Sequence, residues 1–280
     1  MLMKLTVLGT GGSEGVPVLY CKCKVCTSGE QRLRPSYHLK ISDKSEFLIE
    51  AGPDFRTQQQ KFNFDFTHCF FSHAHGDHIN GLLEMRQSFV IGREYLLVKD
   101  PRFSLKLKTP KKFLIGQELH DRFCSMKWAE SVGWAYQELI QEGIFIPVIL
   151  KPNEFRKVDD FEIAILKNTH DKTISNGFIL KSDKKTIIYL ADMSIMDDIT
   201  RGFIDETKPD LIVFHLPAFY ASPRGDHIGI ESLEEFYQKY KVLIGHFSHE
   251  SSLLLSDMVE EAKKRHPNLI VGYDGLNINI

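Results

Sequence analysis

Short apolar runs separated by polar turns recur along the whole chain. Several are apolar at every position, which is typical of strands buried on both faces of a sheet. The turn-forming segment Ser182-Asp183-Lys184 separates two of them. The pattern predicts strands at Lys4–Leu8, His38–Ser42, Glu46–Glu50, Cys69–Ser72, Glu162–Leu166, Gly177–Lys181, Thr186–Leu190, Leu211–Phe214, Val242–Gly245 and Leu269–Tyr273.

Helical spacing of apolar residues is clear in two places. One pattern, with apolar residues at i, i+3, i+4 and i+7, runs from Leu233 to Tyr240 behind an acidic start. The other runs from Leu254 to Ala262, and the serines at 251 and 252 before it can cap a helix. Because strands dominate both halves of the chain and helices are interspersed, the pattern favours an α/β arrangement of helix-covered sheets over a helical bundle.

The segment from about residue 86 to residue 157 has a different character. It contains both tryptophans, Trp128 and Trp134, and predicts a helix near Trp128–Gln141. No catalytic pattern occurs in it. Two interpretations stay open. The segment is either an elaboration, which shapes a substrate pocket or forms an oligomer contact, or it takes part in ordinary packing of helices and strands.

The length and composition set the scale of the fold. A chain of 280 residues with 42% hydrophobic residues can form a core that needs no disulfides. We expect a single domain over residues 1–280, with the 86–157 segment as an elaboration. The 35 basic and 37 acidic residues leave a formal net charge of -2, which excludes a disordered polyelectrolyte. This balance gives no support to nucleic-acid binding through bulk positive charge.

The sequence predicts neither export nor a membrane span. The apolar run Leu5–Leu8 leads directly into Gly9-Thr10-Gly11-Gly12, and it is too short for a signal peptide. No window approaches the roughly 20 apolar residues of a membrane helix. The five cysteines are an odd number, and three of them crowd into one loop, unlike a secreted disulfide framework. We therefore expect a cytoplasmic protein.

Several of the 12 histidines are clustered. The segment Ser72-His73-Ala74-His75-Gly76-Asp77-His78 follows an apolar run and offers four potential metal ligands within six residues. Four such groups at the end of a buried strand are costly to hold together unless something binds them. Gly76 permits the sharp turn that lets them converge. Imidazole together with carboxylate suits Zn, Mn or Fe.

The pattern His-x-His-x-Asp-His resembles the signature of the metallo-β-lactamase superfamily. The resemblance implies an αββα sandwich with a metal site at the strand ends. It also implies three further ligands, each after a later strand, and His170, Asp192 and His246 stand at these places in family order. The closing segment Tyr273-Asp274-Gly275-Leu276 also resembles family members.

The resemblance further implies two catalytic divalent cations, Zn or Mn. Cations roughly 3.5–4 Å apart would share a hydroxide, because coordination lowers the pKa of water from 15.7 to about 7. That bridging hydroxide would be the nucleophile, and Asp77 and Asp192 would be catalytic through the cations that they hold. The implied ligand sets are His73, His75 and His170 on one cation, Asp77, His78 and His246 on the other, and Asp192 as the bridge.

A second cluster, Cys21-x-Cys23-x-x-Cys26, supplies three thiolates in six residues. A closed structural zinc site needs four tetrahedral ligands. The fourth candidate is His249, three residues after His246. The sequence therefore predicts a structural zinc that brings the N-terminal loop against the first site. Incidental packing of reduced cysteines is the alternative.

A narrower resemblance rests on this cysteine loop, on its place after Leu8-Gly9-Thr10-Gly11-Gly12, and on the His-x-x-His near the end. It is to the phosphoribosyl 1,2-cyclic phosphate phosphodiesterases, the PhnP type. Ile49-Glu50-Ala51-Gly52-Pro53-Asp54 and Gly225-Asp226-His227 are further similarities. In that family a histidine at the latter place assists catalysis, which implies that His227 donates a proton to the departing alkoxide or stabilises the phosphorane. A surface-loop residue is the alternative, and His215 is expected to be buried and structural.

These features favour a metal-dependent hydrolase that cleaves a small phosphodiester, and the resemblance implies that this phosphodiester is cyclic. The near-neutral charge fits a small anionic substrate better than nucleic acid, and a homodimer is the default assembly. A tRNA 3′-processing nuclease is one alternative, but the sequence has only the short basic run Lys106–Lys112 in place of a Gly/Pro-rich basic arm. A pyrroloquinoline quinone biosynthesis-type accessory enzyme is another, although that member departs from the full ligand set. A non-catalytic binding module is a third, and the intact ligand set argues against it.

Overall fold

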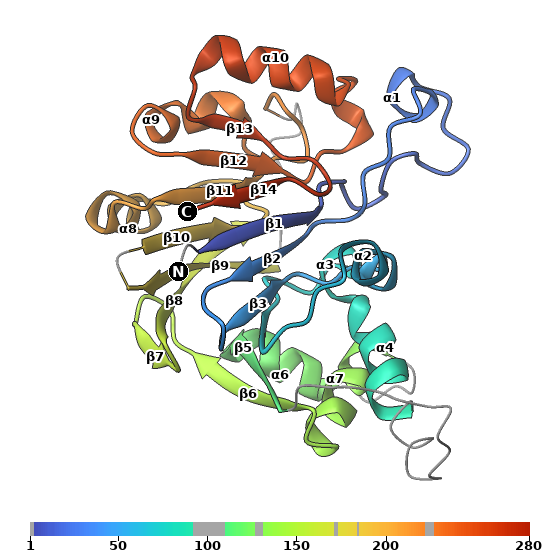
Figure 1. The fold of residues 1–280 in the computed structure, drawn as a ribbon, viewed down its shortest axis with the longest axis vertical. Coiled ribbons are helices and arrows are strands. Elements are labelled where there is room, and N and C mark those ends of the chain that lie inside the picture. Colours follow the sequence, from blue (N-terminus) through green and yellow to red (C-terminus); the bar gives the residue numbers. More distant parts are fainter. Residues whose placement is uncertain (1–2, 92–109, 127–130, 171–172, 184, 222–226) are drawn as a thin grey trace.

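The structure is a computed structural model that describes residues 3–91, 110–126, 131–170, 173–183, 185–221 and 227–280. In these residues two sheets of seven strands each pack face to face, and helices cover both outer faces (Figure 1). This layering confirms the expected αββα sandwich. None of the helices in the described part of the chain combines the length and apolar character that crossing a bilayer requires.

The first sheet is mixed. Its strands follow the order β14-β1-β2-β3-β4-β5-β6. Neighbours from β14 to β3 pair antiparallel, and neighbours from β3 to β6 pair parallel. The strands are β1 (Lys4–Gly9), β2 (Ser36–Lys40), β3 (Glu46–Ile49), β4 (His68–Phe70), β5 (Lys111–Gly116), β6 (Phe145–Leu150) and β14 (Asn277–Asn279).

The second sheet is mixed as well, in the order β13-β12-β11-β10-β9-β8-β7. Strands β10 to β13 pair parallel, whereas β7 to β10 pair antiparallel. The carboxyl ends of β8, β10, β11 and β12 therefore meet at one edge, which is where side chains from distant segments can converge. The strands are β7 (Arg156–Val158), β8 (Phe161–His170), β9 (Thr173–Ser182), β10 (Lys185–Leu190), β11 (Leu211–His215), β12 (Val242–Gly245) and β13 (Leu269–Val271).

The helices form two outer layers. Apolar residues of α2, α4, α6 and α7 pack on the first sheet, and those of α8, α9 and α10 pack on the second. Helix α1 lies apart from both layers in the N-terminal loop (Figure 1). The helices are α1 (Lys24–Thr27), α2 (Phe55–Phe62), α3 (Gly76–Ile79), α4 (Gly81–Arg86), α6 (Gln117–Ser125), α7 (Val132–Gln141), α8 (Asp198–Thr207), α9 (Glu234–Tyr237) and α10 (Leu255–Arg265), with short turns at Gln87–Ile91, Ile230–Leu233 and His249–Ser251.

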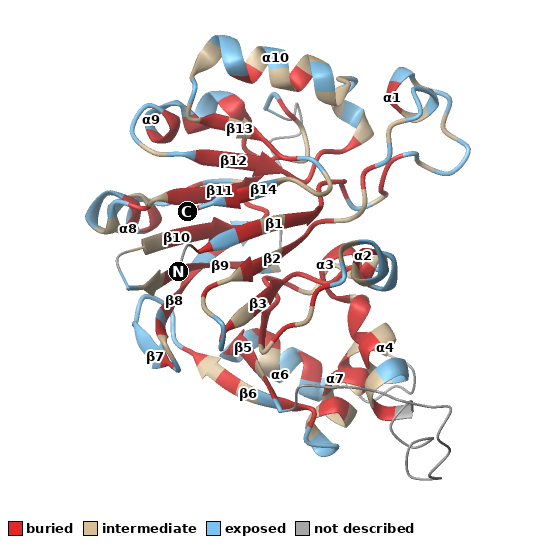
Figure 2. Cartoon of the chain, in the orientation of Figure 1, coloured by how far each residue is buried: buried red, intermediate tan, exposed pale blue. Residues whose placement is uncertain are grey.

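The central core lies between the two sheets. Alternate residues of each strand point inward, as the two-residue period of a strand requires. Phe47 and Phe70 of the first sheet meet Phe178 of the second edge to face, with ring centroids 5.5 and 5.0 Å apart. Figure 2 shows the resulting division, with buried strands at the centre and helices that are exposed only on their outer sides.

The structure contains the ten predicted strands, with shifted ends, and adds four. Strands β5, β6 and β7 come from the 86–157 segment, so its described residues contribute edge strands and covering helices. Residues 92–109 and 127–130 of that segment, including Trp128, lie outside the described residues. Helix α10 is capped at Leu254, whose N–H donates to the Asp257 carboxylate at 3.1 Å. Neither predicted serine supplies this cap.

Truncation of Phe178 tests the role of the inter-sheet core. The ring is fully buried, so Phe178→Ala should lower the free energy of unfolding by about 3–5 kcal/mol. Phe155→Ala is the matched control, because Phe155 is 38% exposed and should cost less. Urea unfolding with a chelator present separates packing from metal binding. Equal losses for the two variants would contradict the assignment of the core.

Candidate metal centre

Residues from both sheets supply the site. The segment from His73 to His78 follows β4 of the first sheet and enters α3. His170 ends β8, Asp192 follows β10, and His246 follows β12, all at the shared edge of the second sheet. The structure therefore brings together all seven candidate ligands that the sequence pointed to.

The turn that carries Asp77 and His78 is built against the segment from Glu50 to Gly52. The N–H of Ala51 donates to the carbonyl of His78 at 2.8 Å. A side chain on Gly52 would lie 2.0 Å from the carbonyl oxygen of Asp77, so only glycine allows this approach. The motif Glu50-Ala51-Gly52 thus acts through the shape of its backbone, which holds the ligand turn in place.

One group of side chains comprises His73, His75, His170 and Asp192, whose ligand atoms lie within 4.8 Å of one another. The Nε2 atom of His73 lies 3.0 Å from Nδ1 of His75. The other ring nitrogen of His73 lies 2.8 Å from the Ser72 hydroxyl, which can fix the orientation of the ring. Two imidazole nitrogens that face each other at this distance suit a shared cation.

The Oδ2 atom of Asp192 is the point on which the site converges. It lies 3.7 Å from Nε2 of His170, 3.8 Å from Nε2 of His78 and 3.3 Å from Nε2 of His246. Ligand–zinc bonds of about 2.1 Å in a tetrahedron place neighbouring ligand atoms about 3.4 Å apart. The separations around Asp192 therefore fit divalent cations on both of its sides.

Asp77 and His215 are alternative ligands of the second cation, whose other candidate ligands include His78 and His246. His215 belongs to the compact group that also contains His78, Asp192 and His246. Both of its ring nitrogens have protein partners, at 2.9 Å from Oδ1 of Asp192 and 3.1 Å from the Tyr189 hydroxyl. Asp77 instead turns Oδ2 toward Nε2 of His78 at 3.2 Å and Nε2 of His246 at 3.7 Å. We therefore place Asp77 in the ligand set and His215 behind Asp192.

The hydrogen bonding of His246 leaves one of its nitrogens for a cation. Its Nδ1 lies 3.1 Å from the carbonyl oxygen of Gly11, which can only accept, so Nδ1 carries a proton. In the neutral ring Nε2 then has a lone pair, and it faces only the carboxylates of Asp192 and Asp77. The backbone of His246 has a φ of +68°, a strained conformation of the kind that clusters at functional sites.

The ring nitrogens of His78 are also left for a cation. It is fully buried, and neither ring nitrogen makes a well-directed hydrogen bond. The oxygens near them belong to carboxylates, at 3.2 Å for Asp77 and 3.4 Å for Glu50. Buried polar atoms without hydrogen bonds are costly unless a ligand satisfies them. The donor set thus fits divalent cations on the evidence of its own unsatisfied nitrogens.

The electrostatics of the site favour positive charge. Burial lowers the pKa of His78, but Asp77 and Glu50 outweigh it and raise this pKa well above its ordinary value. Burial raises the pKa of Asp192, but His246 and His215 outweigh it and hold this pKa well below its usual range. Burial raises the pKa of Asp77 too, but His78 and His246 outweigh it and lower this pKa. The carboxylates of Asp77 and Asp192 therefore stay ionised and attract cations.

A buried chain of polar side chains supports Asp192 from behind. The Tyr189 hydroxyl donates to Oε1 of Glu50 at 2.9 Å and lies 3.1 Å from Nε2 of His215. Burial lowers the pKa of His215 to about 4, so the neutral ring donates from Nδ1 to Asp192. Glu50 also accepts from the N–H of Ser72 at 3.2 Å. Glu50 and Tyr189 were not singled out as functional from the sequence, since their roles depend on contacts between the sheets.

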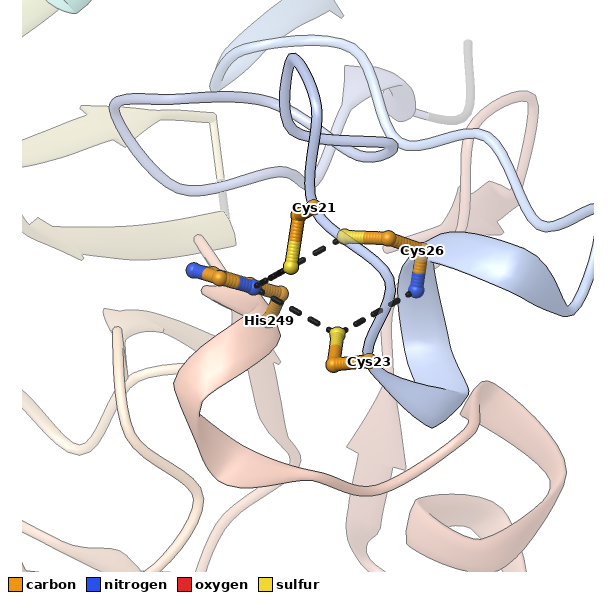
Figure 3. A group of neighbouring side chains, drawn as sticks. All are labelled: Cys21, Cys23, Cys26 and His249. Carbon is orange, nitrogen blue, oxygen red and sulfur yellow. Dashed lines mark hydrogen bonds between the residues drawn. The ribbon is translucent and has the colours of Figure 1, made fainter.

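The three cysteines of the N-terminal loop meet His249. Its Nδ1 lies 3.5 Å from the sulfurs of Cys21 and Cys23 and 3.6 Å from that of Cys26 (Figure 3). A tetrahedral zinc with bonds of about 2.3 Å to sulfur and 2.0 Å to nitrogen requires S–N separations of about 3.5 Å. A hydrogen bond from the Cys26 N–H and the neighbouring His249 lower the pKa of Cys23 to about 6, which favours its thiolate.

A cavity of about 210 Å³ opens onto the candidate ligands. His227 lines it, and its ring centroid lies 5.0 Å from that of His170. No described residue of the 86–157 segment lines this cavity. A larger cavity of about 490 Å³ lies elsewhere, beside α2, and none of the candidate ligands lines it. The lining residues of the smaller cavity are Gly12, Ser13, Glu14, His75, Asp77, His170, Asp192, Pro217, Ala218, His227, His246, Ser248 and Glu250.

Two curated relatives resemble the chain in sequence. An octanoyltransferase of Porphyromonas gingivalis (strain ATCC BAA-308 / W83) is 35% identical over 282 residues, which cover 98% of this chain and 51% of that protein. The chain thus spans about half the length of that relative. A ribonuclease Z of Phocaeicola vulgatus (strain ATCC 8482) is 25% identical over 287 residues, which cover 84% of this chain and 88% of that protein.

Solved structures share the fold at low sequence identity. A diphosphatase from the PhnP family matches with a TM-score of 0.75 at 22% identity, covering 100% of this chain and 98% of the other. Zn²⁺-bound PqqB from Methylobacterium extorquens matches with a TM-score of 0.73 at 15% identity, covering 99% and 100%. YhfI from Bacillus subtilis, a metallo-β-lactamase fold protein, matches with a TM-score of 0.70 at 17% identity and full coverage of both chains.

These likenesses confirm the metallo-β-lactamase fold. A protein family described as Anti-Pycsar protein Apyc1 matches residues 30–256. The match includes eight of the eleven candidate metal ligands, and the three cysteines of the N-terminal loop precede it. The chain therefore belongs to the Anti-Pycsar protein Apyc1 family and has the metallo-β-lactamase fold.

Proposed function

We propose that this chain is a metal-dependent phosphodiesterase that hydrolyses a small, cyclic phosphodiester. The observation that carries the proposal is the convergence of His78, His170 and His246 on one buried oxygen of Asp192. The family match and the likeness to proteins named as diphosphatase and ribonuclease Z support chemistry at phosphorus.

The proposed ligand set holds two divalent cations, zinc or manganese. When bound, they would activate water near neutral pH and offset the charge of the phosphate. Asp192 contributes Oδ2 between them, and His215 fixes the other oxygen of this carboxylate. The proposed sets are His73, His75 and His170 on one side, Asp77, His78 and His246 on the other, and Asp192 between them.

His227 is the proposed proton donor. It lines the cavity beside His170, and its side chain is only partly buried, so it can reach both substrate and solvent. As the phosphorus–oxygen bond to the leaving group breaks, its imidazolium would transfer a proton to the departing oxygen. The carboxylates of Asp77 and Asp192 would hold the cations and would not be free to serve in this role.

The Cys/His cluster is proposed to hold one structural zinc. The S–N separations near 3.5 Å carry this part of the proposal. None of the five cysteines forms a disulfide. Reduced cysteines support a cytoplasmic location, which we propose with the zinc.

Replacement of Asp192 tests the dinuclear centre. Asp192→Asn keeps the size of the side chain and removes the charge that both cations share. Turnover of bis(p-nitrophenyl) phosphate should fall more than about 100-fold, and the metal content per chain should fall with it. Asp43→Asn is the control, because its side chain is 80% exposed in a turn far along the sheet from the site. Full metal content and turnover in the Asp192 variant would refute the centre.

The role of His227 can be tested with two leaving groups. His227→Gln should lower kcat for adenosine 2′,3′-cyclic phosphate by about 10²–10⁴-fold, because the departing alkoxide needs a proton. Turnover of bis(p-nitrophenyl) phosphate should change little, since p-nitrophenolate leaves without one. Equal losses with both substrates would show that His227 is not the proton donor.

The structural zinc can be counted. Cys23→Ala should remove one zinc per chain and lower the melting temperature by about 5–10 °C. The control is Cys124→Ala, since Cys124 is an exposed thiol outside the cluster. Metal analysis and thermal unfolding give the two readouts. Unchanged zinc content in the Cys23 variant would show that the Cys/His cluster does not bind zinc.

The likeness to a ribonuclease Z makes an RNA substrate the second candidate. The net charge of -2 favours a small substrate instead. Cleavage of a tRNA precursor, with affinity that falls steeply in moderate salt, would favour the nuclease.

A further inference from the structure

The cavity over the candidate metal centre has a negative rim. Apart from the proposed ligands and His227, its described lining residues carry two carboxylates, Glu14 and Glu250, and the hydroxyls of Ser13 and Ser248. No lysine or arginine is among them in the part of the chain that the structure describes. Carboxylates repel a phosphate, so their place beside a phosphodiester site calls for a different partner on the substrate.

Glu14 is fixed in this rim. Its Oε1 accepts a short hydrogen bond from the buried Ser248 hydroxyl, and its Oε2 accepts from the Ser13 hydroxyl at 3.2 Å. The Glu14 side chain is only 27% exposed.

The Cys/His cluster lies directly behind Glu14. Nδ1 of His249 faces the three sulfurs, whereas its Nε2 lies 3.8 Å from Oε1 of Glu14. This separation is an ion-pair distance, too long for a direct hydrogen bond. The cluster therefore lies next to the same carboxylate that lines the cavity, and the two serine hydroxyls hold that carboxylate in place.

Glu14 has capacity left for a ligand. An ionised carboxylate offers about four acceptor sites and no donor, and two serine hydroxyls occupy two of them. The partner must therefore donate a hydrogen bond. In a cavity of about 210 Å³ shared with the metal centre, the donor must lie close to the phosphate. The donors that a phosphodiester carries there are the hydroxyls of its sugar.

We propose that Glu14 accepts a hydrogen bond from a sugar hydroxyl next to the scissile phosphate. The inference rests on the proposed phosphodiesterase function and narrows its substrate class. Glu14 selects a diester on a sugar that keeps a free neighbouring hydroxyl, and it disfavours a second phosphate at that place.

Two nucleotides that differ by one hydroxyl test the proposal. Adenosine 3′,5′-cyclic phosphate and its 2′-deoxy counterpart are compared as competitors of bis(p-nitrophenyl) phosphate hydrolysis. In the wild type the inhibition constant of the deoxy compound should be about tenfold higher, as expected for one hydrogen bond to a charged acceptor. The rise in melting temperature that each nucleotide causes gives a second readout, independent of turnover.

The variants at position 14 decide the matter. Glu14→Ala should bring the ratio of inhibition constants close to one, and Glu14→Gln should give an intermediate ratio because its amide oxygen is uncharged. Glu250→Gln, the matched rim control, should keep the wild-type ratio. Zinc analysis shows whether either variant disturbs the Cys/His cluster. If Glu14→Ala lowers the zinc content, the ratio of inhibition constants is judged from Glu14→Gln instead.

Each negative result has a distinct meaning. A wild-type ratio near one, or a tenfold ratio that survives in the Glu14 variants, overturns the role of Glu14. Failure of the metal-loaded wild type to hydrolyse bis(p-nitrophenyl) phosphate overturns the proposed function itself, and the substrate inference with it.

Discussion

The Asp192 carboxylate is the contact on which the site depends. It is almost fully buried between the two sheets, where an isolated charge would be costly. Histidines from three separate strand ends compensate this cost by facing one of its oxygens, and His215 binds the other. Such a cluster is stable only if positive charge accompanies it, which the histidines supply as protons or as cations that they bind. Metal binding is thus built into the electrostatics of the fold.

The sandwich makes this convergence possible. Parallel pairing from β10 to β12 brings Asp192, His215 and His246 to one edge, and the turn after β4 brings His73 to His78 from the opposite sheet. The backbone at Glu50 and His246 has φ values of +60° and +68°, conformations that cost energy for these residues. Both strained residues touch the site, so the surrounding packing stabilises a geometry that serves the ligands.

The sequence revealed the local parts of this arrangement and missed the non-local ones. His73 to His78 were recognisable because four potential ligands lie within six residues. Asp192 and His246 could be placed only through a family resemblance, since nothing in their immediate sequence marks them. The support by Glu50 and the position of Glu14 each depend on contacts across more than 20 residues of chain. Periodicity cannot show which strand ends face each other. The strand pattern in the sequence also did not predict β5 and β6, which pair with each other at the edge of the first sheet.

The short segment from His246 to His249 couples the two candidate metal sites. His246 faces the Asp192 carboxylate, Phe247 is buried, and His249 faces the cysteines. The N-terminal loop closes on this segment from the other side, since the N–H of Phe247 donates to the Thr10 carbonyl and Gly11 accepts from His246. Loss of the cluster would free this loop, and both the orientation of His246 and the place of Glu14 would change with it. A structural zinc here would therefore influence substrate binding as well as stability.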